Sequence, residues 1–227
     1  MKIVVLTGAG ISAESGIHTF RDAGGLWEGH DVMEVATPEG FARNPDLVYQ
    51  FYNERRRALA EVEPNAAHRA LARLEDSFGL DFLLITQNVD DLHDRQGHER
   101  LLHMHGQLYQ ARTESGRVLE WRGDMDASSR DPETGERVRP HIVWFGETPL
   151  HMDEIDRAVR ACDVFCAIGT SGVVYPAAGL SELAWRNSAR TVEINPKPTG
   201  GPFSQVIEGP AASAVPRWVD DILRRTG

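Results

Sequence analysis

Short apolar runs rich in β-branched residues recur along the chain, and they alternate with longer stretches in which apolar residues recur every three or four positions. The first pattern is typical of buried strands and the second of amphipathic helices. We expect strands at Ile3–Leu6, Phe82–Thr86, Val164–Ile168 and Thr191–Ile194. We expect helices at Pro45–Ala60, Ala66–Ser77, His151–Ala161, Ala177–Asn187 and Ala211–Arg225. This alternation predicts an α/β fold with a doubly wound parallel sheet.

Two stretches break the alternation of strands and helices. Residues 25–78 carry helical patterns but no strand, and they are too many for a simple crossover. Residues 110–139 are polar and rich in turn-forming residues, with Arg117–Trp121 as a candidate hairpin arm. We expect both stretches to build a smaller lobe within a single domain that spans residues 1–227. The larger lobe would consist of residues 1–24, 79–109 and 140–227.

Composition narrows the classes of protein that fit this pattern. A fraction of 41% hydrophobic and 26% charged residues is ordinary for a globular domain of 227 residues. The net charge of −10 argues against nucleic-acid binding but is compatible with a lysine-rich peptide as partner. The sequence has no apolar run as long as a membrane span, no signal-peptide pattern and only two cysteines. We therefore expect a cytoplasmic protein with no membrane and no nucleic-acid partner.

Glycines follow the first predicted strand at short spacing. Gly8, Gly10 and Ala13 match the pattern G-x-G-x-x-G/A, which forms a tight turn into a helix in dinucleotide-binding proteins. Because glycine has no Cβ, such a turn lets backbone N–H groups approach a phosphate. The same spacing also occurs in turns that serve packing alone, so both interpretations stay open on this segment.

Polar side chains follow the second predicted strand. Gln87, Asn88 and Asp90 come directly after Phe82–Thr86, where open α/β sheets bind their ligands. Two amides beside a carboxylate suit a carboxamide and sugar hydroxyls. The alternative is a helix start that is capped by Asp90 or Asp91.

Two histidines, His103 and His105, stand before Gly106. Histidine is the side chain best suited to move protons near neutral pH. Alternate side chains of an extended segment point to opposite faces, so we expect one ring to face a cleft and the other to face away. This separation argues against a metal site formed by the pair. The alternative is a buried, hydrogen-bonded histidine with no chemical role. Gly106, which lacks a Cβ, permits another backbone segment to approach closely at this point.

Three further segments place small or polar residues near strand ends. His141–Glu147 is expected to form an apolar strand that ends in a glycine turn, and its edge could pair with an extended peptide. Gly169–Ser171 follows the third predicted strand, and Asn195-Pro196 follows the fourth. Small polar residues at several neighbouring strand ends indicate a cradle for ribose and phosphate.

Taken in order, these segments resemble the signature of the sirtuins. The resemblance rests on Gly8–Arg21, Thr86–Asp90, His105-Gly106, Val143–Glu147 and Gly169–Ser171, and it covers nearly the whole chain. It implies an NAD-dependent protein lysine deacylase with a Rossmann-type large domain and a small domain. NAD and an acylated lysine of a protein substrate would meet in the cleft between them. The reaction would consume NAD and release nicotinamide and O-acyl-ADP-ribose.

The resemblance also implies roles for individual residues. His105 would be the catalytic base, and Asn88 would belong to the catalytic group as well as to the nicotinamide and ribose pocket. The backbone of Ala9 and Gly10, with Ser12, would hold the pyrophosphate. The other residues implied in NAD binding are Gly8, Ala13, Phe20, Arg21, Trp27, Gln87, Val89, Asp90, Gly169, Thr170, Ser171, Asn195, Pro196, Lys197 and Ala211. Those that would flank the substrate peptide are Val143, Phe145, Gly146 and Glu147. Within the NAD set, Phe20 and Arg21 would lie in a flexible loop that closes over NAD.

One face of a predicted helix suggests which acyl group the protein removes. Tyr52 and Arg55 are three residues apart in the predicted helix Pro45–Ala60 and therefore share a face. A phenol and a guanidinium can bind a carboxylate together. The spacing Tyr-x-x-Arg resembles the sirtuin branch that removes succinyl and malonyl groups. Without that resemblance, Arg55, Arg56 and Arg57 would indicate a solvated basic face.

The chain departs from the sirtuin pattern in one respect. Sirtuins usually hold a zinc ion with four cysteines in the small domain, but Arg112–Arg139 contains no cysteine. Cys162 and Cys166 flank the start of a predicted strand, where a buried structural role is expected. We therefore expect no zinc. The segment would instead depend on Leu119, Trp121 and hydrogen bonds among Arg122, Asp124, Asp126, Arg130 and Glu133.

Other interpretations of an NAD site stay open. An ADP-ribosyltransferase or an NAD glycohydrolase would cleave the same bond of NAD with another acceptor, and a catalytically silent module would only sense the nucleotide. His105, Tyr52 and Arg55 favour deacylation, because an acyl pocket has no purpose otherwise. A dehydrogenase fits poorly, because the acidic residue expected about 20 positions after the glycines is not followed by a clear second strand.

Overall fold

The larger of the two main sheets has six strands, all parallel, in the order β11-β10-β9-β1-β4-β5. The computed structural model describes residues 1–17, 26, 27 and 29–226. The strands are β1 (Ile3–Thr7), β4 (Phe82–Thr86), β5 (Leu101–His103), β9 (Val164–Ile168), β10 (Arg190–Asn195) and β11 (Gln205–Glu208). The four predicted strands are confirmed to within one residue at each end. The short edge strands β5 and β11 were not predicted.

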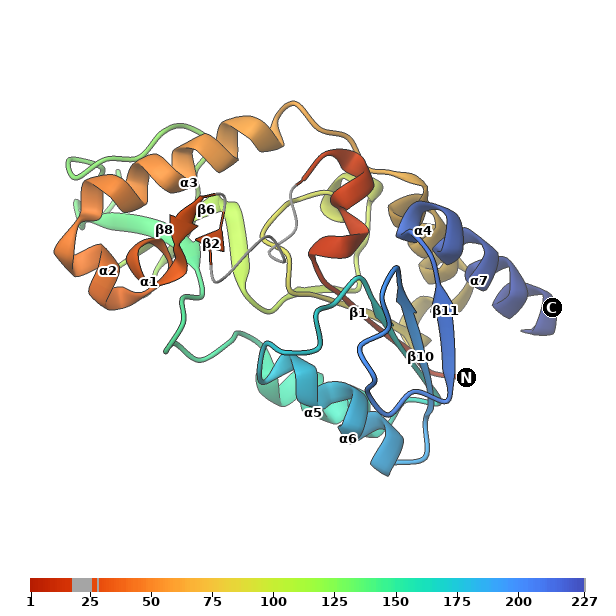
Figure 1. Ribbon diagram of the computed structural model, residues 1–227. Helices are drawn as coiled ribbons and strands as arrows, with labels where there is room; N and C mark the ends of the chain where they lie inside the picture. The colour runs from red at the N-terminus through yellow and green to blue at the C-terminus, as the bar shows by residue number, and fades with distance from the viewer. Residues whose placement is uncertain (18–25, 28, 227) are drawn as a thin grey trace.

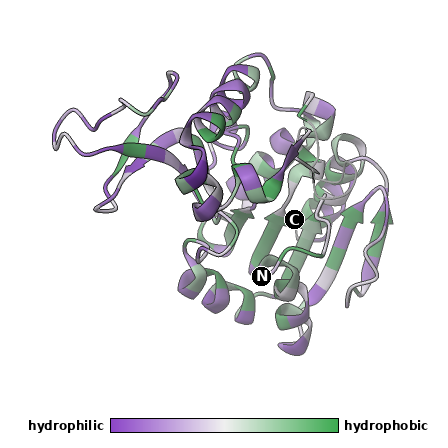
Figure 2. Ribbon diagram, turned by 60° about the vertical axis from the view of Figure 1, so that its left-hand side comes forward, coloured by the Kyte–Doolittle hydropathy of each residue, from purple (hydrophilic) through white to green (hydrophobic). Residues whose placement is uncertain are grey.

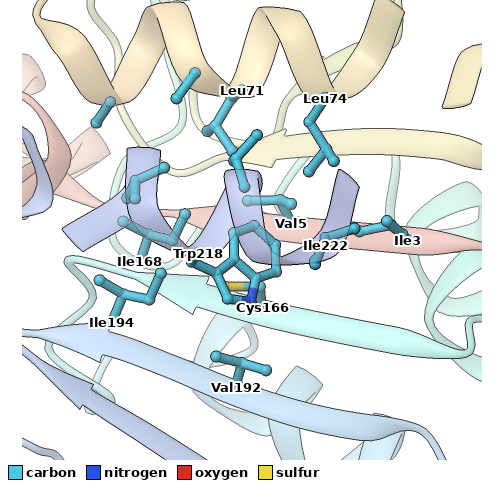
Figure 3. Close-up of a cluster of buried hydrophobic side chains, with 14 of the residues drawn as sticks. Ile3, Val5, Leu71, Leu74, Cys166, Ile168, Val192, Ile194, Trp218 and Ile222 are labelled. Carbon is cyan, nitrogen blue, oxygen red and sulfur yellow. The ribbon is translucent and has the colours of Figure 1, made fainter. Parts of the chain in front are cut away.

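Helices cover both faces of this sheet, which confirms the doubly wound arrangement (Figure 1). The covering helices are α4 (Ala66–Phe78) and α7 (Ala211–Thr226) on one face, and α5 (Met152–Arg160) and α6 (Leu180–Arg186) on the other. Alternate residues of β1 point to opposite faces. Val5 packs with Leu71 and Trp218 in one buried cluster, drawn in Figure 3, whereas Leu6 belongs to the second cluster on the far side. Figure 2 accordingly shows the central strands as mostly hydrophobic.

The predicted helices form, with small changes at their ends. α3 spans Pro45–Leu59, and the predicted Ala177–Asn187 begins as a 3-10 turn, η5 (Ala177–Gly179), before α6. The helix expected after the glycines is absent from the described residues there. Two 3-10 turns stand in its place, η1 (Ala9–Ile11) and η2 (Ala13–Ser15). No helix in the described part of the chain has both the length and the apolar character needed to cross a membrane.

A second sheet of three antiparallel strands lies at the opposite end of the molecule from α7 (Figure 1). Its strands are β6 (Gly106–Thr113), β7 (Val118–Glu120) and β8 (Val138–Ile142), and the helices beside it are α1 (Val32–Val35), α2 (Pro38–Arg43) and α3. The hairpin arm expected within Arg117–Trp121 is confirmed as β7. Two expectations are wrong. Residues 25–78 do contain strands, the short hairpin β2 (Leu26–Trp27) and β3 (His30–Asp31), and the strand expected at His141–Glu147 ends at Ile142.

Helix α4 packs on the large sheet rather than beside α3. Its buried face, which includes Ala67, Leu71 and Leu74, shares a cluster with residues of β1 and α7. The prediction that all of residues 25–78 belong to the smaller lobe is therefore wrong for α4. A helical period shows that one face is buried, but it does not show against which neighbour.

A buried arginine of α3 joins this helix to the loop between β7 and β8. Arg56 is 2% exposed, and it donates to the carbonyl oxygen of Leu108 at 2.8 Å and to that of Gly123 at 3.2 Å. It also donates to Asn53 Oδ1 at 2.7 Å, and the Asn53 amide exchanges two hydrogen bonds with the backbone of Met125. α3 therefore holds the 123–125 segment through backbone atoms.

The rest of that loop is held partly by the residues expected. Trp121 packs against the cluster of Tyr49 and Met125, and Asp126 accepts hydrogen bonds from Ser128. Asp131 was not predicted. Its carboxylate accepts a hydrogen bond from Thr134 at 2.9 Å and pairs with Arg117 at 3.1 Å. The local turn is thus organised around a buried carboxylate.

Candidate active site

One cavity of about 740 Å³ runs from the carboxyl ends of β1, β4, β9 and β10 to helix α3. This edge is where open α/β sheets place their ligands. The predicted site residues that line the cavity are Gly8, Ala9, Gly10, Ala13, Trp27, Tyr52, Arg55, Gln87, Asn88, Val89, Asp90, His105, Val143, Phe145, Gly146, Glu147, Gly169, Thr170, Ser171, Asn195 and Pro196. Ser12, Lys197 and Ala211 do not line it, and Phe20 and Arg21 lie outside the described residues.

The glycine-rich turn after β1 packs directly on the loop after β9. The amide of Gly10 donates to the carbonyl oxygen of Gly169 at 2.9 Å. A Cβ on Gly10 would lie 2.6 Å from the Cα of Gly169, so the two backbones can approach this closely only as glycines. The Gly10 amide is therefore engaged within the protein. Of the backbone groups expected to hold a pyrophosphate, the amide of Ala9 has no acceptor among the described residues.

Ser12 connects the glycine-rich turn to the polar residues after β4. Its buried hydroxyl donates to Asp90 Oδ2 at 3.0 Å and accepts from Asn88 Nδ2 at 3.2 Å. Asp90 Oδ1 also accepts from the amide of Leu92 at 3.1 Å, which closes a local turn. No helix begins at this point, because the next element is the 3-10 turn η4 (Asp94–Gln96), so the expected helix cap at Asp90 or Asp91 is wrong. Ser12 thus orients two cavity-lining side chains instead of lining the cavity itself.

Burial sets the charge of Asp90. It raises the pKa of this carboxyl to about 6, although the hydrogen bonds from Leu92 and Ser12 act in the opposite direction. The carboxyl group is therefore close to half-ionised at pH 6 and mostly ionised at pH 7.

His105 presents one ring nitrogen to the cavity in a defined state. Its Nδ1 lies 3.1 Å from the carbonyl oxygen of Gln87, and because a carbonyl only accepts, Nδ1 carries the hydrogen. In the neutral ring Nε2 therefore carries the lone pair. Burial lowers the pKa of His105, so the neutral form predominates at neutral pH. This is the state that a general base requires.

The two histidines separate as expected. His103 ends β5 and is buried, with Nε2 3.0 Å from Asp94 Oδ2, whereas His105 lines the cavity. Gly106 follows with a positive φ of 80°, and an added Cβ would lie 1.9 Å from the carbonyl oxygen of His141. The close approach expected of this glycine therefore exists, between β6 and β8.

Tyr52 and Arg55 lie together at the α3 end of the cavity. Tyr52 is fully buried, and its hydroxyl accepts a hydrogen bond from Trp144 Nε1 at 3.0 Å. The Arg55 guanidinium lies 3.3 Å from the centre of the Phe51 ring and donates to the carbonyl oxygen of Phe51. The shared face expected from their spacing is confirmed, and it is not a solvated face.

The segment after β8 lines the cavity, and several of its polar groups are hydrogen-bonded within the protein. The amide of Val143 donates to His105 O, and that of Phe145 donates to Ala36 O, each at 2.9 Å. Glu147 is bound by Arg112 and Arg139, so its carboxylate is an internal anchor. Phe145 itself is 43% exposed, which leaves its side chain accessible beside the cavity.

Several residues that line the cavity were not predicted from the sequence. The main ones are Glu54, Ala58, Val62, Leu108, Trp144, Val174 and Tyr175. Ala58 follows Arg55 by three residues, so helical spacing could have identified it. Trp144 carried no such signal, because its contact with Tyr52 joins positions far apart in the sequence.

Comparisons with known proteins agree with this geometry. The model of the Sir2 family matches residues 8–176. A relative from Salmonella typhimurium, named NAD-dependent protein deacylase, is 54% identical over 230 residues, which cover 98% of this chain and 84% of the relative.

Solved structures agree as well. A Sir2 homologue in complex with NAD has a TM-score of 0.89 and 36% identity, with 100% of this chain and 91% of that chain covered. Sir2Af2 bound to a myristoylated histone peptide has a TM-score of 0.75 and 31% identity, with 99% and 92% covered. A family match over most of the chain and a relative above 50% identity leave one conclusion: this chain belongs to the Sir2 family.

Proposed function

We propose that this protein is an NAD-dependent protein lysine deacylase that prefers lysines carrying succinyl or malonyl groups. The observation that carries the proposal is that one cavity joins His105 to Tyr52 and Arg55. The relatives named NAD-dependent protein deacylase support the class of reaction. The phenol and the guanidinium at the far end of the cavity support the acyl group.

The glycine-rich end of the cavity fits NAD. A volume of about 740 Å³ lies within the range of pockets that enclose small molecules. The glycines at positions 8, 10 and 169 make this wall from backbone, which suits a pyrophosphate, and Asn195 lies beside them. The Sir2 homologue solved with NAD supports the same ligand. When bound, NAD would supply a cleavable bond to nicotinamide and so provide ADP-ribose as the acceptor of the acyl group.

The residues at the centre of the cavity would hold and move protons. His105 would take up a proton at Nε2 while Nδ1–H remains bound to Gln87 O. Asn88 and Asp90 would orient the nicotinamide end, because Ser12 fixes both side chains. The cavity would hold the reacting groups in line.

The α3 end of the cavity would hold the acyl group. A carboxylate there would accept from the Tyr52 hydroxyl and from the Arg55 guanidinium, and charge-assisted hydrogen bonds are the stronger kind. An acetyl group offers no carboxylate, so it would gain nothing from either side chain. Selectivity for acidic acyl groups would follow from this difference.

The substrate partner would be an acylated lysine on a protein. The solved structure of Sir2Af2, which is bound to a myristoylated histone peptide, supports an acylated peptide as the substrate. We propose that Val143, Phe145, Gly146 and Val174 flank such a peptide, since all four line the same cavity as His105.

The test is incubation with NAD and matched acetyl-, succinyl- and malonyl-lysine peptides, with O-acyl-ADP-ribose detected by mass spectrometry. Tyr52→Phe and Arg55→Met should each lower kcat/KM for the succinyl peptide relative to the acetyl peptide by about 10- to 100-fold, from the loss of one hydrogen bond to a charged group. Arg57→Met is the matched control, because Arg57 pairs with Asp124 outside the cavity.

Two outcomes would contradict the proposal. Equal losses of both activities in the Tyr52 and Arg55 variants would remove the acyl assignment. Nicotinamide release without any O-acyl-ADP-ribose would favour an NAD glycohydrolase or an ADP-ribosyltransferase instead.

We also propose that the β7–β8 segment needs no zinc. Residues 112–139 offer no cysteine, so the residues present do not fit the usual four-cysteine site. Arg56 and Asn53 support the segment in its place through their bonds to Gly123 and Met125. Elemental analysis of the purified protein should find far less than one zinc per chain, and stoichiometric zinc would overturn this proposal.

A further inference from the structure

Trp144 belongs to the segment that we propose to flank the peptide, and its side chain contacts Tyr52 at the acyl end of the cavity. It is 3% exposed, and it lines the cavity together with Tyr52. Its indole Nε1–H donates to the Tyr52 hydroxyl oxygen at 3.0 Å. A buried tyrosine and a buried tryptophan from distant parts of the chain therefore meet through one hydrogen bond at this point.

This hydrogen bond defines what the Tyr52 hydroxyl can do. A phenol has one hydrogen to donate and lone pairs to accept with. The indole N–H of Trp144 donates to the phenol oxygen of Tyr52, and no acceptor for the phenol hydrogen lies among the described residues. Burial raises the pKa of Tyr52, so the hydroxyl keeps its hydrogen. Tyr52 is thus held as a hydrogen-bond donor at the cavity wall, beside Arg55.

The indole itself is fixed from three directions. The guanidinium of Arg139 lies 3.8 Å from the centre of the Trp144 ring. The Trp144 amide donates to Glu147 Oε2 at 2.9 Å, and Glu147 Oε1 is bound by both Arg112 and Arg139. Phe41 packs against the ring at 5.2 Å between centroids. The direction of the indole N–H is therefore set by side chains of α2, β6, β8 and the loop after β8.

We propose that Trp144 is a positioning residue for acyl selectivity, which orients the Tyr52 hydroxyl as a donor to the carboxylate of a succinyl or malonyl group. This inference rests on the proposed function. A donor fixed before binding loses less freedom when the carboxylate arrives, so the effect falls on binding of acidic acyl groups. An acetyl group makes no contact that depends on the hydroxyl. Trp144 is then a determinant of selectivity that does not touch the acyl carboxylate itself.

The experiment compares Trp144→Phe with Tyr52→Phe and with the double variant. Phenylalanine keeps an aromatic ring but lacks the N–H. Trp144→Phe should lower the ratio of kcat/KM for succinyl over acetyl peptide by roughly tenfold, mainly through a higher KM for the succinyl peptide. The double variant should be no less selective than Tyr52→Phe alone, because the indole acts through the phenol.

Two further variants serve as controls. One tests whether Trp144→Phe acts through misfolding, and the other tests whether the loss of any tryptophan N–H hydrogen bond has the same effect. Trp144→3-benzothienylalanine replaces only the N–H by sulfur and keeps the shape of the ring. Trp121→Phe is the matched control, because Trp121 Nε1 donates to Asp124 O outside the cavity at 3.2 Å. The first should reproduce the tenfold loss of selectivity, and the second should leave the ratio unaltered.

The outcomes separate this inference from the proposed function. If Tyr52→Phe lowers the succinyl-to-acetyl ratio but neither Trp144 variant does, the role of Trp144 is overturned while the acyl assignment stands. If the Trp144 variants lower both activities equally, the tryptophan is merely structural and the inference fails. If Tyr52→Phe leaves the ratio unchanged, the acyl assignment fails and this inference falls with it.

Discussion

Replacing Arg56 with methionine should destabilise the protein far more than the same change at Arg57, the next residue of α3. Arg56 is 2% exposed and donates to Leu108 O, Gly123 O and Asn53 Oδ1, whereas the side chain of Arg57 is 60% exposed and pairs with Asp124. The two substitutions remove the same charge from adjacent positions. The difference between the two losses of stability therefore measures what the buried hydrogen bonds of Arg56 contribute.

The magnitude follows from the contacts. A hydrogen bond to a charged group contributes about 1.5 kcal/mol or more, and Arg56→Met removes three of them. Burial lowers the pKa of Arg56 to about 10, because desolvation of the guanidinium costs free energy. The methionine variant has no charge to desolvate, so it avoids this cost. We therefore expect a net loss of about 3 kcal/mol, within the range for breaking a buried polar contact. The exposed pair of Arg57 should contribute less than about 1 kcal/mol.

The assay is thermal unfolding of the wild type and both variants, with and without a metal chelator. For a chain of this size about 3 kcal/mol corresponds to a fall in Tm of roughly 6–12 °C. Arg57→Met should change Tm by less than about 3 °C. Hydrogen exchange should also accelerate at the amide of Met125, which donates to Asn53 Oδ1 at 2.9 Å. Equal shifts for both variants, or a large shift with the chelator alone, would refute the argument that Arg56 holds this segment.

Further predictions concern the site. Gly106→Ala should abolish folded protein in expression trials, because its Cβ would meet His141 O at 1.9 Å, whereas Gly123→Ala, in open space, should express normally. kcat/KM for deacetylation should fall as the pH drops, with an inflection below the ordinary histidine pKa of 6.5, because burial lowers the pKa of His105 and only its neutral form accepts a proton; an inflection above 6.5 would contradict this role. Asp90→Asn should raise Tm at pH 8 but not at pH 4. The pKa of Asp90 is about 6 in the folded protein and 3.8 in the unfolded chain, so the stability of the wild type falls by about 3 kcal/mol as the pH rises between these values. Equal shifts in Tm at both pH values would exclude this cause.

Local patterns in the sequence were sufficient for the four inner strands of the large sheet. Its inner strands, such as Val164–Ile168, are continuous apolar runs because both faces are covered, and such runs are visible in the sequence. The polar residues that follow these strands, Asn88 among them, could be placed at the cavity because all parallel strands end at the same edge. Tyr52 and Arg55 were paired through helical spacing together with the resemblance to the sirtuins.

Non-local contacts account for what the sequence analysis missed. Arg56 stands in a run of three arginines that resembles a solvated face, and only the loop that folds over α3 makes it a buried donor. Ser12 was expected at a pyrophosphate, but its hydroxyl is used by Asp90 and Asn88, which lie more than 70 positions further along the chain. The edge strands β5 and β11 have only three and four residues, too few for an alternating pattern to identify them.

The position of β1 inside the large sheet governs when the fold can form during synthesis. Ile3 pairs with Phe82 on one side and with Val164 on the other. A ribosome must therefore add about 160 residues after β1 before both edges of this apolar strand are covered. Until then the glycine-rich turn has no β9 loop to pack against, and the growing chain exposes a strand edge that favours association with other chains. A fragment that ends before β9 should consequently depend on chaperones or aggregate, even though it contains His105, Tyr52 and Arg55.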